Sequence, residues 1–422
     1  MIFCLDIIKE IFYNLDLKYQ LKFIQINKYF NNNLQIIDFY YIDQQYREKI
    51  KNKILKNYPH IQKLYTVNNS YNWLKIKNMT NLKQLACIGS CNITDDDIKN
   101  LNQLVKLKTD NNMDIENISH LTNLRVLSCR YDCEISDLTN NIHLTKLNIL
   151  CNTKIKNINH LTNLKKLNCN NLTSSNDIKN LDLIELNICD NEYIKDLNFL
   201  TNLKVMKCRK CNINDSDIKK LDLIKLDISY NSSIKNINHL TNLQILNCIS
   251  GRCTYFSGIT DEGIKQLTNL IELNATNNTK IKNINNLTNL RTLNCYGNCG
   301  INNESITRLM NLTKLNVKNN FKIKNINNLT NLKILNCYGN CRIKNIDKLT
   351  NLIELNVNDN INIVNVDNLI NLEVLKCSYQ CGISDVKMLT NLTKLQAFEN
   401  KNVINNSVYL TKLKRRIWAE YF

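Results

Sequence analysis

The chain has 422 residues, of which eight are Gly, one is Pro, 18 are Cys and about one in five is Asn. So few Gly and Pro argue against the common catalytic scaffolds, whose tight turns and phosphate loops need residues with positive or fixed φ. The 43% hydrophobic fraction excludes wholesale disorder, and the net charge of +18 fits either an acidic partner or a codon bias toward Lys, Asn and Ile.

The first residues, MIFCLDIIKEIFYNL, lack the basic start of a secretory leader. Asp6, Lys9 and Glu10 interrupt their apolar stretch, and no later run is long enough to cross a membrane. We expect the many cysteines to be free thiols. The cysteines and the missing leader together predict an intracellular, reducing compartment, cytoplasmic or nuclear, and no membrane association.

Residues 1–60 precede the regular part of the chain and carry apolar residues at helical spacing. The string LDIIKEIFYNLDLKYQLKFIQINKYF (5–30) resembles an F-box, the helical module that docks on the Skp-type adaptor of cullin-based ubiquitin ligases. Asp6 stands where that family usually has Pro. A two-helix amphipathic cap on a solenoid would show the same spacing. The resemblance implies adaptor contacts by Leu5, Ile8, Ile11, Phe12, Leu15, Leu21 and Ile24.

The pattern L-x-x-L-x-apolar-x-x-N then recurs along most of the chain. Its copies begin at Leu82, Leu104, Leu124, Leu144, Leu164, Leu183, Leu203, Leu223, Leu243, Leu270, Leu290, Leu312, Leu332, Leu352, Leu372 and Leu392. Most intervals are 20 residues, and a weaker capping copy begins at Ile61. This pattern resembles the leucine-rich-repeat family from about 61 to 413. Each copy predicts a short parallel strand followed by a turn whose Asn amide bonds the backbone.

The expected fold is α/β: a curved parallel sheet on the concave face, with short 3₁₀ or helical turns on the convex face. The expected domains are an F-box-like module at 1–45, a helical linker at 46–60, a solenoid of about 16 repeats plus the capping copy at 61–413, and a C-terminal cap at 414–422.

The copies alternate between two classes, because the sixth position is Cys in every second copy, from Cys87 to Cys377. The segment CNITDDDIKNL (91–101) resembles the cysteine-containing repeats of F-box proteins, whereas NxxIKNIxxLTNL resembles the shorter repeats of internalin-type binding proteins. Five C-x3-C pairs invite a metal interpretation. We instead expect buried thiols that act as small hydrophobic side chains, and no metal or cofactor.

The solvent side of the strands is the predicted target-binding face, since aromatic residues among charges of both signs suit protein recognition. A nucleic-acid groove would be cleared of carboxylates. The repeat from Leu243 carries seven extra residues within ISGRCTYFSG (249–258), either a loop that reaches over the face or a tolerated excursion. The predicted target-binding residues are Tyr131, Lys146, Glu185, Lys225, Tyr230, Arg252, Tyr255, Phe256, Glu272, Tyr296, Lys314, Tyr338, Glu354 and Tyr379.

No nucleophile with a base, phosphate loop or metal cluster emerges, so we expect a chain that is not an enzyme. The combined resemblance implies the substrate-recognition subunit of a Skp/cullin/F-box ubiquitin ligase, monomeric in itself, that holds a protein target near the charged enzyme. One alternative is a repeat scaffold or decoy that recruits no ligase. The other is polyanion binding through a basic edge, formed by Lys156, Lys235, Lys282, Lys324 and Lys344.

Overall fold

The computed structural model describes residues 15–16, 19–20, 38–39, 61–67, 76–251, 256–339, 341–400, 403 and 415–417. The chain divides into two compact units, Met1–Asn187 and Ile188–Phe422. Within the described residues, no helix has both the length and the apolar composition that crossing a membrane requires.

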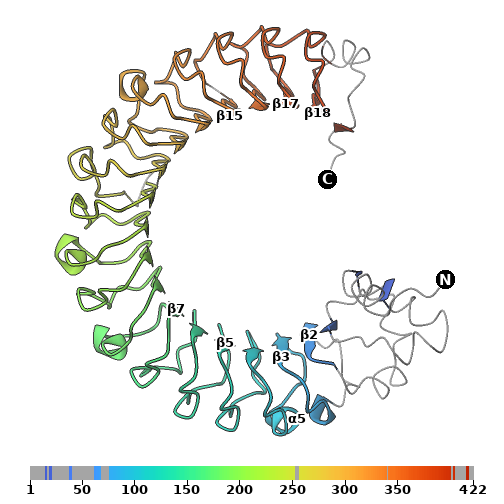
Figure 1. Ribbon diagram of the computed structural model, residues 1–422, viewed down its shortest axis with the longest axis vertical. Coiled ribbons are helices and arrows are strands. Elements are labelled where there is room, and N and C mark those ends of the chain that lie inside the picture. Colours follow the sequence, from blue (N-terminus) through green and yellow to red (C-terminus); the bar gives the residue numbers. More distant parts are fainter. Residues whose placement is uncertain are drawn as a thin grey trace, which may run out of the picture. The chain divides into compact units, whose positions relative to one another are not determined.

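The first unit is a parallel sheet of short strands connected by turns and short helices (Figure 1). Its elements are β1 (Asp38–Phe39), β2 (Lys63–Val67), η2 (Ile76–Asn78), β3 (Gln84–Ile88), α5 (Asp95–Ile98), β4 (Lys106–Lys108), β5 (Val126–Ser128), β6 (Lys146–Asn148), β7 (Lys166–Asn168), η3 (Ser175–Ile178) and β8 (Glu185–Asn187). From β1 to β8, each strand pairs in parallel with the next one along the chain.

The second unit repeats this arrangement. Its elements are β9 (Val205–Lys207), η4 (Asp215–Ile218), β10 (Lys225–Asp227), β11 (Ile245–Asn247), β12 (Glu272–Asn274), β13 (Thr292–Asn294), η5 (Glu304–Ile306), β14 (Lys314–Asn316), β15 (Ile334–Asn336), β16 (Glu354–Asn356), β17 (Val374–Lys376), β18 (Lys394–Gln396) and β19 (Arg415–Ile417). These strands also pair in parallel in chain order.

The strands form where the sequence alternates apolar and polar residues. In β15, Leu335 is buried while Ile334 and Asn336 on either side are half-buried. Leu332, which opens that copy, is also fully buried, so both leucines of the motif face the core. The strands β3 to β18 match the sixteen predicted copies one for one, and β2 matches the capping copy. The predicted parallel solenoid is therefore confirmed.

The turn after every second strand, from β4 to β18, is held by a buried Asn, as predicted. The Asn152 Oδ1 atom accepts hydrogen bonds from the backbone N–H groups of Lys154 and Ile155, at 2.8 and 3.2 Å. Its Nδ2 group donates to the Cys129 carbonyl of the preceding repeat, at 3.1 Å. Cys211 substitutes for this Asn, because its Sγ donates to the corresponding carbonyl of Ile188 at 2.8 Å. The same place is occupied by Asn112, Asn191, Asn231, Asn278, Asn320, Asn360 and Asn400, all buried.

The return limbs carry only single helical turns, such as α5, η3 and η4. Each of these begins with a capping box, and in η3 the Ser174 backbone N–H donates to Asp177. This agrees with the prediction of short 3₁₀ or helical turns in a repeat too short for a full helix.

The predicted F-box-like module at 1–45 lies almost entirely outside the described residues. Leu15 is described, at a bend where its carbonyl accepts a hydrogen bond from Gln20 Nε2 at 2.9 Å. The remaining predicted adaptor contacts lie outside the described residues: Leu5, Ile8, Ile11, Phe12, Leu21 and Ile24. The predicted linker at 46–60 lies outside them as well.

Candidate functional site

The predicted charged residues of the binding face begin the three-residue strands and lie on their solvent side. Lys146 and Lys314 are exposed. Part of the charge is neutralised within the sheet, because Glu354 forms an ion pair with Lys376 of the next strand at 2.9 Å. The half-buried members of this set are Glu185, Lys225, Glu272 and Glu354.

In the first unit, Tyr131 belongs to a cluster at the end of β5. The Arg130 guanidinium lies 5.4 Å from the centre of the Tyr131 ring and 2.8 Å from the Asp110 carboxylate. Burial alone would raise the pKa of Asp110, but hydrogen bonds from Arg130 and Ser128 bring this pKa below its ordinary value. Asp110 therefore fixes Arg130, and Arg130 covers one face of Tyr131.

The insertion of the second unit is closed at its base by a hydrogen bond from the Ser257 backbone N–H to Ser250 Oγ, at 2.9 Å. Phe256 is exposed, as a ligand-contacting residue must be. Arg252 and Tyr255 lie outside the described residues.

The second unit also carries a row of aromatic side chains at the ends of successive strands. Tyr296, Lys318 and Tyr338 each follow their strand by two residues, after β13, β14 and β15. The Lys318 Nζ atom lies 5.6 Å from the centre of the Tyr296 ring and 4.1 Å from that of Tyr338. The two rings thus share one cation.

The row continues at β17 and β18. The rings of Tyr379 and Phe398 meet edge to face, with centres 5.5 Å apart and planes at 75°. Burial raises the pKa of Tyr338, and the nearby Asp359 carboxylate, which hydrogen-bonds its hydroxyl, raises it further. We call Tyr296, Lys318, Tyr338, Tyr379 and Phe398 the aromatic row.

The backbone under the row is fixed by the strand asparagines. The Oδ1 atoms of Asn294 and Asn336 accept hydrogen bonds from the backbone N–H groups of Tyr296 and Tyr338, at 3.3 and 3.2 Å. The Tyr338 carbonyl accepts the Asn319 N–H at 3.0 Å. The backbone that carries the rings is therefore held in place before any partner arrives.

Sequence reasoning identified the tyrosines but not Lys318, which links Tyr296 and Tyr338, nor Asp359, which lies beside Tyr338. The repeated string CYGNC, at 295–299 and 337–341, was the available signal. Tyr230 lies after β10, three strands before the row begins.

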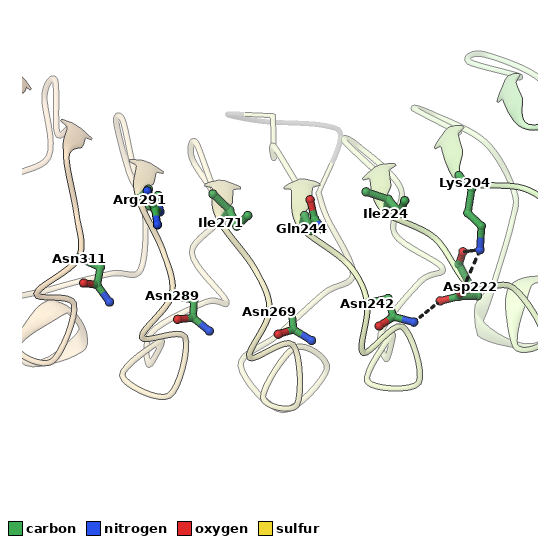
Figure 2. Close-up of a pocket in the computed structure, with 10 residues that line it drawn as sticks. All are labelled: Lys204, Asp222, Ile224, Asn242, Gln244, Asn269, Ile271, Asn289, Arg291 and Asn311. Atoms are coloured by element: carbon green, nitrogen blue, oxygen red, sulfur yellow. Dashed lines mark hydrogen bonds and ion pairs between the residues drawn. The ribbon is translucent and has the colours of Figure 1, made fainter.

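A shallow cavity of about 510 Å³ opens at the starts of β9 to β13. Figure 2 shows its asparagine amides in one row beside the strand-start side chains. These amides are already engaged: Asn269, Asn289 and Asn311 each donate to a backbone carbonyl of the preceding repeat, at 2.9 to 3.0 Å. Each of these bonds uses one of the two N–H groups of its amide. Because no aromatic side chain lines this cavity, the aromatic row is the stronger candidate for binding a protein.

The C-x3-C pairs lie inside the repeats. Cys337 and Cys341 are fully buried and hydrogen-bonded to each other, which raises the pKa of Cys337 and lowers that of Cys341. Sequence reasoning missed this contact within the pair. Among the residues that the structure describes, no three His, Cys, Asp or Glu side chains are placed to hold a metal ion together.

No protein-family model and no curated protein matches the sequence. Solved structures do match the fold. The TLR13–ssRNA13 complex has a TM-score of 0.54 and 17% identity, with 85% of this chain and 74% of that chain covered. A leucine-rich-repeat protein of Leptospira interrogans has a TM-score of 0.47 and 20% identity, with 84% and 93% covered.

The functional domain of InlJ from Listeria monocytogenes, which includes a cysteine ladder, has a TM-score of 0.44 and 21% identity, with 80% of this chain and 68% of that chain covered. At these identities the likeness concerns the fold. With its buried leucines, its asparagine turns and its parallel strands, the chain has the fold of a leucine-rich-repeat solenoid with cysteine-rich repeats.

Proposed function

We propose that this chain is a binding scaffold that holds a protein partner on the aromatic row of the second unit. The observation that supports this most directly is the shared cation between two rings on a backbone already fixed by hydrogen bonds. Aromatic side chains supply much of the binding energy at protein interfaces, and rigid ones lose little entropy on binding. The proposal gives the chain no catalytic step.

The surrounding charges favour a protein over a polyanion. Glu354 begins β16, and Asp359 lies beside Tyr338 within the row itself. A phosphate backbone laid along the strand ends would meet the Asp359 carboxylate, and one laid along the strand starts would meet that of Glu354. The TLR13 structure of similar fold contains a single-stranded RNA, so the nucleic-acid alternative has a direct test: such binding would weaken steeply with salt as counterions are released.

The experiment begins with the full chain as bait and identifies a bound protein by mass spectrometry. Its affinity is then measured with purified components. The double substitution Tyr338→Ala, Tyr379→Ala should weaken binding by about tenfold or more, because truncating aromatic anchors typically costs over 1 kcal/mol. Tyr193→Ala is the matched control, since Tyr193 is exposed in the same unit but lies outside the row. Equal affinities for all three proteins would reject the proposal.

On the resemblance of residues 5–30 to an F-box, we further propose that this scaffold is the substrate-recognition subunit of a Skp/cullin/F-box ubiquitin ligase. The test is co-purification of the intact chain with a Skp-type adaptor and cullin. Phe12→Asp, or deletion of 1–33, should abolish it. If the intact chain binds no adaptor, and deletion of 1–33 leaves both partner binding and partner abundance unchanged, the chain is a repeat-only scaffold or decoy.

A further inference from the structure

The aromatic row has a spatial period set by the sheet. Tyr296 follows β13 and Tyr338 follows β15, each by two residues, and both strands pair in register with β14 between them. Neighbouring strands lie about 4.8 Å apart, so equivalent positions two strands apart are separated by about 9.6 Å. Tyr379 follows β17 by three residues, one position beyond the place of Tyr296 and Tyr338, which Ser378 occupies in that repeat, so the two equivalent tyrosines span one period.

This period selects among the regular conformations that a bound segment can adopt. A polyproline II helix brings residues i and i+3 to the same side every 9.3 Å or so. An extended strand repeats at about 6.8 Å, and an α-helix repeats its face at about 5.4 Å or, over seven residues, about 10.5 Å. Over the one period between Tyr296 and Tyr338, the heptad spacing misses the separation by about 0.9 Å, whereas polyproline II misses it by about 0.3 Å.

The chemistry of the row agrees with this spacing. A polyproline II segment has no internal hydrogen bonds, so its carbonyl groups need external donors, and its proline rings dock on aromatic side chains. The Lys318 Nζ atom lies 5.6 Å from the centre of the Tyr296 ring and 4.1 Å from that of the Tyr338 ring. Its ammonium has three N–H groups, which can donate to a carbonyl. The tyrosines supply the ring faces, and Lys318 supplies the donor between them.

Resting on the proposed function, we infer that the partner presents a proline-rich segment in the polyproline II conformation across strands β13 to β15. Prolines at i and i+3 lie on Tyr296 and Tyr338, and a carbonyl between them accepts from Lys318.

The experiment uses the full chain and fluorescein-labelled dodecaproline, with a Gly-Ser dodecamer as the control peptide, measured by fluorescence anisotropy. Dodecaproline should bind saturably and the Gly-Ser peptide should not. Tyr338→Ala should weaken dodecaproline binding by about tenfold or more, while Tyr193→Ala leaves it unchanged. Tyr338→Phe keeps the ring and should stay within about threefold of the native affinity, which keeps the test valid if Tyr338→Ala fails to fold.

Absence of saturable dodecaproline binding, or equal binding by the native chain and a folded Tyr338→Ala variant, overturns the inference. These results are separable from the proposed function. If a protein partner still needs Tyr338 and Tyr379 but dodecaproline does not bind, the binding scaffold stands and the polyproline II segment does not. Tighter binding of an amphipathic α-helical peptide or a uridine dodecamer to the row would likewise overturn the inference.

Discussion

The Nζ atom of Lys318 lies 4.1 Å from the centre of the Tyr338 ring and also contacts the ring of Tyr296. One side chain that follows β14 thereby connects rings that follow the two flanking strands. A cation over an exposed aromatic face contributes roughly 0.5 to 1 kcal/mol, enough to restrict the rings without closing the surface. The spacing of these side chains along the aromatic row follows from the spacing of the repeats.

Replacing a turn asparagine should destabilise the solenoid strongly. Asn152→Ala removes a fully buried side chain that accepts from Lys154 and Ile155 and donates to Cys129 of the preceding repeat. Unpaired buried groups cost about 1 to 3 kcal/mol each, so we expect a loss of about 2 to 4 kcal/mol in the free energy of unfolding.

Urea denaturation measures this loss. Asn123→Ala is the matched control, because Asn123 is exposed and makes one hydrogen bond, to the Asn102 carbonyl at 2.9 Å. Equal losses for the two variants would show that the turn asparagines have no special role.

The pair of Asp110 and Arg130 should make the first unit sensitive to acid. The folded-state pKa of Asp110 lies below its unfolded value. The carboxylate therefore contributes stability that is fully present above the unfolded pKa of about 3.9 and is lost as pH falls through the folded pKa.

Thermal unfolding from pH 6 to pH 2.5 should show a smaller acid-induced loss for Asp110→Asn than for the native chain. Asp96→Asn, at an exposed pair with Lys99, should track the native chain. Parallel acid curves for Asp110→Asn and the native chain would contradict the account.

The cysteines should differ widely in reactivity, because the thiolate is the nucleophile and burial suppresses it. Burial raises the pKa of Cys211 to about 12 and holds that of Cys248 far above its ordinary value. Cys151 is exposed. Iodoacetamide at pH 8 should modify Cys151 in the native chain and reach Cys211 and Cys248 only after unfolding, as followed by mass spectrometry. Modification of Cys211 at the rate of Cys151 would be inconsistent with the buried thiol.

Gly339→Ala should strain the backbone next to Tyr338 of the aromatic row and destabilise the fold. Gly339 has φ of +76°, and an added Cβ would lie 2.0 Å from Asn319 Oδ1. The left-handed backbone alone costs a non-Gly residue about 1 to 2 kcal/mol, and the contact adds to this. Adding Asn319→Ala removes the clashing oxygen, so a denaturation series should show the second substitution recovering part of the loss. If Asn319→Ala recovers none of the lost stability, the loss does not come from the contact between the added Cβ and Asn319.

The leucine spacing predicts the solenoid well, because each inward position must be apolar for neighbouring repeats to bury one another. Leu332 and Leu335 are fully buried for that reason. The pairing of Lys318 with the tyrosines is not predictable from this pattern. It depends on side chains of neighbouring repeats meeting at the strand ends, where no burial requirement fixes residue type.

The contact within a C-x3-C pair could likewise not be predicted from the leucine spacing. The spacing indicated that Cys337 faces the core, but the contact with Cys341 depends on how the turn brings the chain back. The F-box resemblance of residues 5–30 remains a prediction, since those residues lie almost entirely outside the described part of the chain.

Hydroxyl-radical footprinting of the native chain with its purified protein partner tests the binding surface most directly. The account predicts that Tyr296, Tyr338, Tyr379 and Phe398 become protected together on binding, while Tyr193 and Tyr131 keep their free reactivity. Protection of Tyr193 or Tyr131 with an unchanged aromatic row would contradict it.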